Sequence, residues 1–282
     1  MIRFGPSGNS ARFYAEGYKS SADAPKWLAE QGLTAYEYSF GKGINIGDAK
    51  ANEIGAKARE YGVAISVHAP YYINFANPSD EMAEKSYNYV LNSCSKARQF
   101  YGNRIIFHAS TVGRMTRFDA VELTKKRLRI LADMIVANKM DDCLFCPETM
   151  GRINQIGDTE EIVEFCKIAD FYLPTIDFGH LNARTYGSLK TAEDYDKIVT
   201  YIINNLGMER ASKMHIHFSK IEYSKGGEVK HLTFEDKIFG PEFEPLAEVI
   251  YKHNLQPVII CESNGTQADD ALTMKRIFND IV

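Results

Sequence analysis

Residues 64–68 read Ala64-Ile65-Ser66-Val67-His68, a short β-favouring run that ends on a histidine. Runs of this length, set between segments of helical periodicity, predict strands buried in a parallel sheet. Similar runs recur along the whole chain. The eight predicted strands are residues 2–5, 34–40, 63–69, 104–109, 142–148, 174–177, 213–218 and 257–262.

Helical periodicity fills the intervals between these runs, for example over residues 82–101, 120–137 and 194–206. Dividing the 282 residues by eight gives about 35 residues per unit, which is the size of a strand–helix repeat. We therefore predict an α/β protein, a single (β/α)8 TIM barrel that spans residues 1–282 as one domain. A doubly wound open sheet is the alternative. The eight regular units and the lack of a glycine-rich phosphate loop make it less favoured.

The composition is that of a soluble globular protein. The chain has 33 basic and 37 acidic side chains, a formal charge of −4, and 45% hydrophobic residues, which argues against non-specific coating of nucleic acid. Five cysteines do not suggest a disulfide framework, and the spaced pair Cys143 and Cys146 is interpreted as packing. No apolar run approaches the roughly 18 residues of a membrane span, and the first residues resemble a strand more than a signal peptide. We predict a cytoplasmic, intracellular protein without membrane contact.

Ionisable residues stand at the ends of six consecutive predicted strands. In a parallel barrel the loops that follow these ends build the active site. The residues concerned are His68, His108, Glu148, Asp177 with His180, His215 with His217, and Glu262.

Any one of these residues, taken alone, is more simply interpreted as a hydrogen-bonded histidine or a helix cap. Together they would share the small volume at one barrel mouth, where buried ionisable groups are costly without partners. Imidazole and carboxylate ligands suit zinc, manganese or iron, and there are too many donors for one tetrahedral ion. We predict a site for two or three metal ions.

The other histidines are less clear from position. His231 follows the flexible stretch 224–227 and could fold back over the mouth or lie in solvent. His217 shares a strand face with His215, so a role as ligand, substrate contact or hydrogen-bond donor stays open. His253 lies in a helical segment and is interpreted as a surface residue.

An aromatic run, Tyr71-Tyr72-Ile73-Asn74-Phe75, follows His68 directly. Aromatic side chains at the active face could stack on a base or wedge into a duplex. They could equally pack beneath the loop.

These motifs resemble the endonuclease IV family, the metal-dependent apurinic/apyrimidinic endonucleases (family 2) of the xylose-isomerase-like barrel superfamily. The resemblance covers essentially the whole chain in the family's order. It rests on the segment from His68 to Asn74, and on Phe107-His108, Pro147-Glu148-Thr149, Ile176-Asp177-Phe178-Gly179-His180, Met214-His215, His231 and Glu262.

The resemblance implies a trinuclear Zn²⁺ site, with Mn²⁺ or Fe²⁺ possible in some positions. It assigns the first metal to His68 and His108, bridged by Glu148 to a second metal that Asp177, His215 and Glu262 complete, and the third metal to His180 and His231. It implies catalytic roles for Glu148 and Glu262, and DNA contacts by Tyr71, Tyr72 and Asn74.

Two positions depart from the family pattern. Val229 stands where the family has an aspartate ligand of the third metal, and His217 stands where asparagine is usual. The neighbouring Glu228, and Glu235 and Asp236 further along the chain, are all out of register with the missing aspartate, so the occupancy of the third site is open.

The resemblance implies hydrolysis of the phosphodiester 5′ to abasic sites in damaged double-stranded DNA, by a monomer in base-excision repair. Lysines such as Lys42 and Lys220 would supply local positive charge. The alternative is a sugar isomerase or epimerase of the same superfamily, which needs only one metal held by Glu148, Asp177, His215 and Glu262. A non-catalytic metal-binding sensor is the third interpretation.

Overall fold

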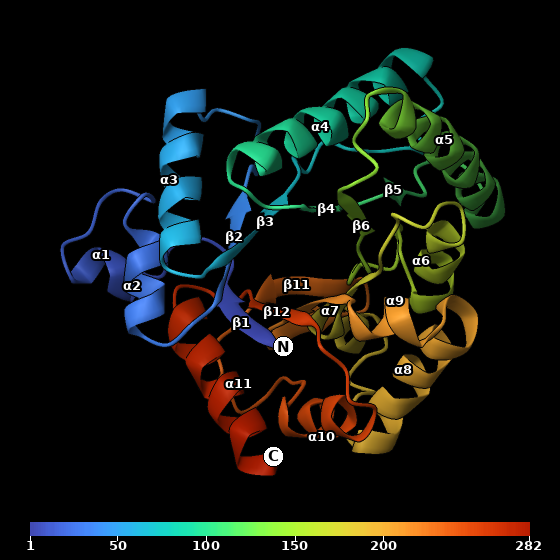
Figure 1. The fold of residues 1–282 in the computed structure, drawn as a ribbon. Helices are drawn as coiled ribbons and strands as arrows, with labels where there is room; N and C mark the ends of the chain where they lie inside the picture. The colour runs from blue at the N-terminus through green and yellow to red at the C-terminus, as the bar shows by residue number, and fades with distance from the viewer.

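Eight parallel strands form a closed barrel in the computed structural model, which describes all residues 1–282, and the predicted TIM barrel is confirmed. Helices form a ring around the strands (Figure 1). The barrel strands are β1 (Arg3–Pro6), β2 (Ala35–Ser39), β3 (Ala64–His68), β4 (Arg104–Phe107), β6 (Leu144–Pro147), β8 (Thr175–Asp177), β9 (His215–Phe218) and β12 (Val258–Cys261). Each of them lies within or overlaps a predicted run.

The strands pair in the order β1-β12-β9-β8 and β2-β3-β4-β6. Parallel bridges between Ser7 and Glu37 and between Glu148 and Thr175 join these two sheets and close the barrel. Because all strands run in the same direction, their carboxyl ends meet at one mouth.

Eleven helices connect the strands and bury their apolar faces against them. They are α1 (Ala11–Ala15), α2 (Ala24–Glu30), α3 (Asp48–Glu60), α4 (Asp80–Gln99), α5 (Arg117–Ala137), α6 (Thr159–Cys166), α7 (Phe178–Arg184), α8 (Ala192–Leu206), α9 (Met208–Ser212), α10 (Glu244–Lys252) and α11 (Gln267–Ile281). Helix α6 begins with a capping box formed by Asp158 and Glu161, and α8 begins with one formed by Thr191 and Asp194. None of the helices has the length and apolar character needed to span a bilayer.

Two short antiparallel pairs stand on the mouth and were not predicted. The first joins β5 (Ser110–Thr111) to β7 (Gln155–Ile156), and the second is a hairpin of β10 (Ile221–Ser224) and β11 (Gly227–His231). The hairpin bridges to Arg152 through Gly227, which has a φ of +87°. A Cβ atom at Gly227 would lie 2.2 Å from the carbonyl oxygen of Gly151, so only glycine permits this close approach.

Candidate metal centre

Glu148 lies at the centre of the barrel mouth, fully buried at the end of β6. Its Oε2 atom is 3.0 Å from Nε2 of His68 and 3.2 Å from Nε2 of His108. Its Oε1 atom is 3.0 Å from Nδ1 of His217. The two carboxylate oxygens therefore face two different groups of ligands, an arrangement suited to bridging two cations.

The first group consists of His68, His108 and Glu148, whose candidate ligand atoms lie within 4.8 Å of one another. His68 ends β3, and its Nδ1 atom is 2.8 Å from the carbonyl oxygen of Ala69. A proton on Nδ1 that is donated to this carbonyl leaves Nε2 bare and directed at the site, as in metal-binding histidines generally.

The second group consists of Glu148, Asp177, His217 and Glu262. Asp177 accepts a 2.7 Å hydrogen bond through Oδ1 from the amide of His180 and so caps helix α7. Its other oxygen, Oδ2, is buried without a hydrogen-bond partner. An orphaned carboxylate oxygen in a closed site is costly unless a cation binds there.

The placement of His215 differs from the expected ligand set. His215 lies one layer deeper in the barrel, with its Nε2 atom 3.1 Å from Oε2 of the buried Glu37. His217 occupies the mouth position instead, because it pairs with Asp177 at the end of β8 whereas His215 pairs with Thr175. The geometry therefore assigns the second group to His217, whose role was open, and removes His215 from it.

The third group contains His180 and His231 together with Glu228, which sequence reasoning had set aside as out of register. Nε2 of His180 is 3.5 Å from Glu228, and Nε2 of His231 is 3.9 Å from it. The geometry of the β10–β11 hairpin explains why Glu228, and not residue 229, faces the two histidines. Glu222 pairs with Lys230 and Tyr223 pairs with Glu228, so Val229 is an extra residue in a β-bulge.

The bulge changes which side chains share a face of β11. Glu228 and His231, three residues apart, both turn towards the site, whereas Val229 is 45% exposed. The acid missing at Val229 is thus supplied by its neighbour. Nδ1 of His231 is 2.8 Å from the hydroxyl of Ser219, and Nδ1 of His180 is 2.9 Å from the carbonyl of Thr149, which orients both Nε2 atoms towards Glu228.

The charges of the cluster strongly influence one another. Burial opposes ionisation of Glu148, yet the imidazoles of His217 and His108 hold the pKa of its carboxyl well below the usual value. Burial, reinforced by the carboxylates of Glu262 and Glu148, raises the pKa of Asp177 to about 6. Without cations, protons on the imidazoles must balance these carboxylates, and divalent metals bound to the same atoms would displace the protons.

This donor set fits divalent metal ions. It offers only imidazole nitrogens and carboxylate oxygens, in three adjacent groups at the mouth and a fourth group, Glu37, His215 and His217, in the layer below. Oδ2 of Asp177 and Oε1 of Glu37 are buried without hydrogen-bond partners, and a hydrogen bond on the far nitrogen of His68 orients its ring. Zinc, manganese and iron all accept such ligands.

A cavity of about 390 Å³ opens above the cluster. Its only Lys or Arg side chain is Arg152, from the loop of residues 150–156 after β6. Two other arginines hold this loop from behind. Arg184 donates to the carbonyls of Met150 and Arg152, and Arg117 donates to those of Ile153 and Gln155.

The residues of the loop after β3 that were predicted to contact DNA differ in their exposure and contacts. Tyr71 is 54% exposed and its ring stacks against His108 with centroids 5.4 Å apart, at the edge of the cavity. Tyr72 is similarly exposed and lies near Tyr89. The side chain of Asn74, predicted to contact DNA, accepts a hydrogen bond from the amide of Ala76 and donates one to the Thr111 hydroxyl within the loop.

Two further side chains differ from or refine the expectations. Lys220 is buried and bound to Glu242, so it adds no free positive charge to the surface, while Lys42 is exposed. Nε2 of His253 is 2.6 Å from Oδ1 of Asp196, a hydrogen bond between the outer helices and away from the metal centre.

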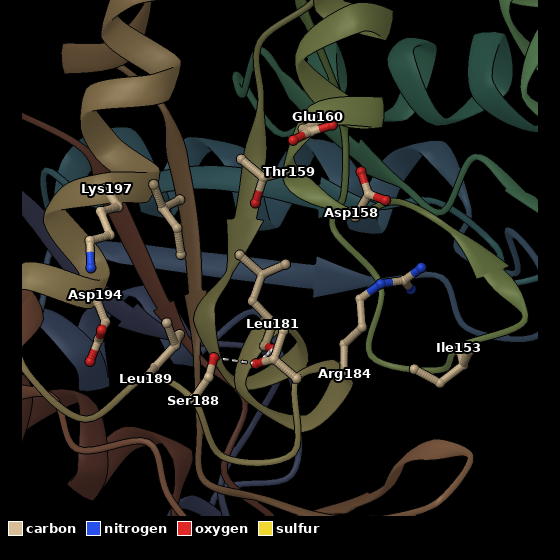
Figure 2. Close-up of a pocket in the computed structure, with 12 residues that line it drawn as sticks. Ile153, Asp158, Thr159, Glu160, Leu181, Arg184, Ser188, Leu189, Asp194 and Lys197 are labelled. Atoms are coloured by element: carbon tan, nitrogen blue, oxygen red, sulfur yellow. Dashed lines mark hydrogen bonds between the residues drawn. The ribbon is translucent and has the colours of Figure 1, made fainter.

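A second cavity, of about 610 Å³, lies outside the barrel mouth between the start of α6, helix α7 and the start of α8 (Figure 2). Ile153 lines it, whereas Arg152 and Gln155 line the cavity above the cluster. The 150–156 loop therefore separates the two cavities, and the larger one contains none of the candidate ligands.

A closed parallel barrel with buried imidazole and carboxylate groups at its mouth defines a metal-dependent barrel enzyme. The chain belongs to the family described as the xylose isomerase-like TIM barrel, whose model matches residues 25–277. The metal-binding character of the site and the membership in this superfamily agree with the expectation from sequence.

Relatives in sequence are close in one case and distant in another. An uncharacterized protein of Methanocaldococcus jannaschii is 30% identical over 277 residues, covering 98% of this chain and 96% of that protein. A protein named probable endonuclease 4 of Acholeplasma laidlawii is 25% identical over 210 residues, covering 72% of this chain and 68% of the other. The endonuclease IV likeness is thus a distant one.

Solved structures share the fold with both expected classes. A D-tagatose 3-epimerase-like protein superposes with a TM-score of 0.74 at 17% identity, covering 99% of this chain and 97% of that one. Endonuclease IV from Thermus thermophilus superposes with a TM-score of 0.69 at 18% identity, covering 99% of this chain and 100% of that one. At these identities the likeness establishes the barrel and does not separate nuclease from epimerase.

Proposed function

We propose that this protein is a metal-dependent endonuclease that hydrolyses the phosphodiester 5′ to abasic sites in DNA. The observation that carries the proposal is the position of Glu148, whose two oxygens face separate ligand groups 3.0–3.2 Å away. A third group, built by His180, Glu228 and His231, lies beside them. A site with several adjacent cation positions suits phosphoryl chemistry, in which charge must be neutralised on both attacking and leaving oxygens.

Each part of the site has a role in this reaction. Bound metals would supply a hydroxide near neutral pH and neutralise the phosphate. Glu148 would bridge two of the cation positions. Glu262 lines the cavity with its side chain 16% exposed, so it can hold the attacking water and accept its proton.

Arg152 is the group that would bind the substrate phosphate. It is the one permanent cation lining the cavity, and the loop that carries it is held by Arg117 and Arg184. A guanidinium in a fixed loop matches the geometry of a phosphate and has no comparable partner on a neutral sugar.

Tyr71 and Tyr72 would contact the damaged strand. Tyr71 stands at the cavity edge with an exposed ring, and such rings stack on nucleobases irrespective of sequence. An abasic nucleotide is the easiest to turn out of a duplex because it has no base to unstack, which would give selectivity for this lesion.

A sugar isomerase or epimerase is the second candidate. The group Glu148, Asp177, His217 and Glu262 is complete by itself and can hold one metal, and a cavity of about 390 Å³ is large enough for a monosaccharide. This interpretation leaves the groups around His68 and His231 without a function.

Metal content and substrate together test the proposal. We expect purified protein to bind two or three divalent ions at the barrel mouth and to nick an oligonucleotide duplex at an abasic analogue with Zn²⁺ or Mn²⁺, with loss of nicking after chelation. Arg152→Gln should raise KM for the duplex by about tenfold or more, whereas Arg276→Gln, at an exposed position of the outer helix α11, serves as the matched control. One bound ion together with turnover of a ketose, and no nicking, would replace the proposal by the second candidate.

A further inference from the structure

Glu37, His215 and His217, here called the deep group, lie inside the barrel one layer below the mouth. Glu37 comes from β2 and the two histidines from β9, and these strands are not neighbours, so the side chains meet across the barrel interior. None of the three is exposed, and their candidate ligand atoms lie within 4.8 Å of one another. Burying a carboxylate and two imidazoles is costly unless their polar atoms have partners.

Several polar atoms of the deep group lack such partners. The Ser66 hydroxyl donates to Oε2 of Glu37 over 2.8 Å, and Nε2 of His215 is 3.1 Å from the same oxygen. The other oxygen, Oε1, is 3.0 Å from Nε2 of His217, yet both of these atoms are buried without a hydrogen bond, as is Nδ1 of His215. Of nine such side-chain atoms in the whole chain, three therefore belong to this one group.

The hydrogen bond of the His217 ring is on its other nitrogen. Nδ1 is 3.0 Å from Oε1 of Glu148, and because a carboxylate can only accept, Nδ1 is the donor. In a neutral imidazole the second nitrogen, Nε2, is then bare. A bare nitrogen and a carboxylate oxygen of Glu37 thus face each other over 3.0 Å, an arrangement that a cation between them would stabilise.

We propose that the deep group binds a divalent metal ion of its own, below the mouth groups and in addition to their ions. One carboxylate and two imidazoles are the protein ligands of known three-ligand zinc sites. Nε2 of each histidine faces a different oxygen of Glu37, at 3.1 Å for His215 and 3.0 Å for His217. Two ligands about 2.1 Å from one tetrahedral ion lie about 3.4 Å apart, so the group needs to open only slightly to hold zinc.

The deep ion would have a structural role. None of its three ligands lines the cavity above the cluster, so substrate does not reach it. It would fix the ring of His217, whose Nδ1 atom is directed at the mouth. An ion in the second group would bind the same ring through Nδ1, so filling both groups makes His217 a bridge between two ions and releases the proton of Nδ1 to solvent.

This inference is independent of the substrate, since the deep group lies below the mouth in a nuclease and in an isomerase alike. Failure of the endonuclease proposal would appear as absence of nicking, whatever ion the deep group holds. Failure of the present inference would appear as absence of that ion, whatever the substrate.

The first test locates the ion directly and needs no variant. Crystals are grown from the full chain, produced and purified with Zn²⁺ present throughout, and diffraction is measured on both sides of the zinc absorption edge. We expect an anomalous peak about 2.0–2.2 Å from Nε2 of His215, Nε2 of His217 and an oxygen of Glu37. Absence of a peak in the deep group, whether or not the mouth groups show peaks, overturns the proposal.

The second test counts ions in solution. His215→Asn removes a ligand of the deep group and of no group at the mouth, so we expect it to hold one Zn²⁺ equivalent fewer than the wild type by elemental analysis. His253→Asn is the matched control, because His253 is bonded to Asp196 on the outer helices, and it should keep every equivalent. Wild-type zinc content in His215→Asn that circular dichroism shows to be folded would overturn the proposal.

Discussion

His217 is the single histidine whose replacement best tests the second ligand group. We expect His217→Asn to lose two metal equivalents, because its Nδ1 atom is directed at Glu148 and Glu262 and its Nε2 atom at Glu37. His215→Asn should lose only the deeper one, since His215 contacts Glu37 in the layer below. Elemental analysis after gel filtration, with circular dichroism to check folding, measures both. Equal losses in the two variants would contradict the placement of the rings.

The raised pKa of Asp177 predicts that the stability of the metal-free protein depends on pH. Burial raises its pKa in the folded protein to about 6, above the value of about 3.9 expected for an unfolded chain. The stability that the protonated carboxyl contributes is therefore present below pH 4 and is lost as the pH rises through 6.

Asp177→Asn should accordingly stabilise the chelated protein by about 1–2 kcal/mol at pH 7.5 and have little effect at pH 4. The asparagine oxygen can still accept the hydrogen bond from His180 that caps α7. Thermal unfolding of chelated wild type and variant at the two pH values measures this. A variant less stable than wild type at pH 7.5 would mean that the carboxylate is paired even without metal.

Sequence could identify nearly all the residues of the cluster but could not choose between His215 and His217. Two residues apart on a strand, both side chains point to the barrel interior, so the alternation pattern treats them alike. The choice depends on how far β9 extends relative to β8 and β12, where His217 is level with Asp177 and Ile260. This alignment of neighbouring strands is set by closure of the barrel, and no pattern in the sequence of β9 itself indicates it.

The bulge in the β10–β11 hairpin leads to a testable prediction about metal binding by the third ligand group. Glu228→Gln should remove one metal equivalent, because Glu228 is the carboxylate beside His180 and His231. Adding Val229→Asp to this variant should not restore the ion, since Val229 is exposed on the other side of the strand. Deleting Val229 from the wild type should preserve the ion, because removal of the extra residue leaves Glu228 two positions before His231 on one face.

The zinc content of these three variants, compared with that of the wild type, shows whether Glu228 is the carboxylate ligand of the third group. Restoration of the ion by Val229→Asp would show that the strand can shift its register in solution. Loss of the ion on deletion of Val229 would show that the bulge also sets the distance of Glu228 from the histidines.

Regular elements were predictable where periodicity was strong, and the short antiparallel pairs were not. The eight barrel strands and helices such as α4, α5, α6 and α8 follow from apolar runs, helical spacing and, for α6 and α8, caps at Asp158 and Thr191. Strands β10 and β11 are four and five residues long, and their residues are mostly polar. Their pairing depends on a contact with Gly151 in another loop, which single-sequence patterns do not contain.

Across the whole molecule, the barrel brings together at its mouth side chains that are as far apart in the chain as His68 and Glu262. Parallel strand order is sufficient to predict this convergence, and for that reason the class of site could be inferred from sequence. The substrate could not, because the superfamily places different reactions on the same mouth, and Arg152, which we propose binds the phosphate, lies on a loop.

The stability of the whole barrel should therefore depend on its metals. Ions that bind only the folded protein stabilise it by about 2.7 kcal/mol each when free metal is a hundred times Kd. For a chain of this size such a change corresponds to a rise in Tm of about 5 to 10 °C per ion. We expect chelation to lower Tm by at least this amount, and readdition of Zn²⁺ to restore it with release of protons from the imidazoles. His217→Asn should show a smaller response, because the two ligand groups that share this ring are incomplete. A Tm unchanged after metal removal would mean that protonated imidazoles alone neutralise the buried carboxylates, and that the cluster stabilises the fold without binding metal.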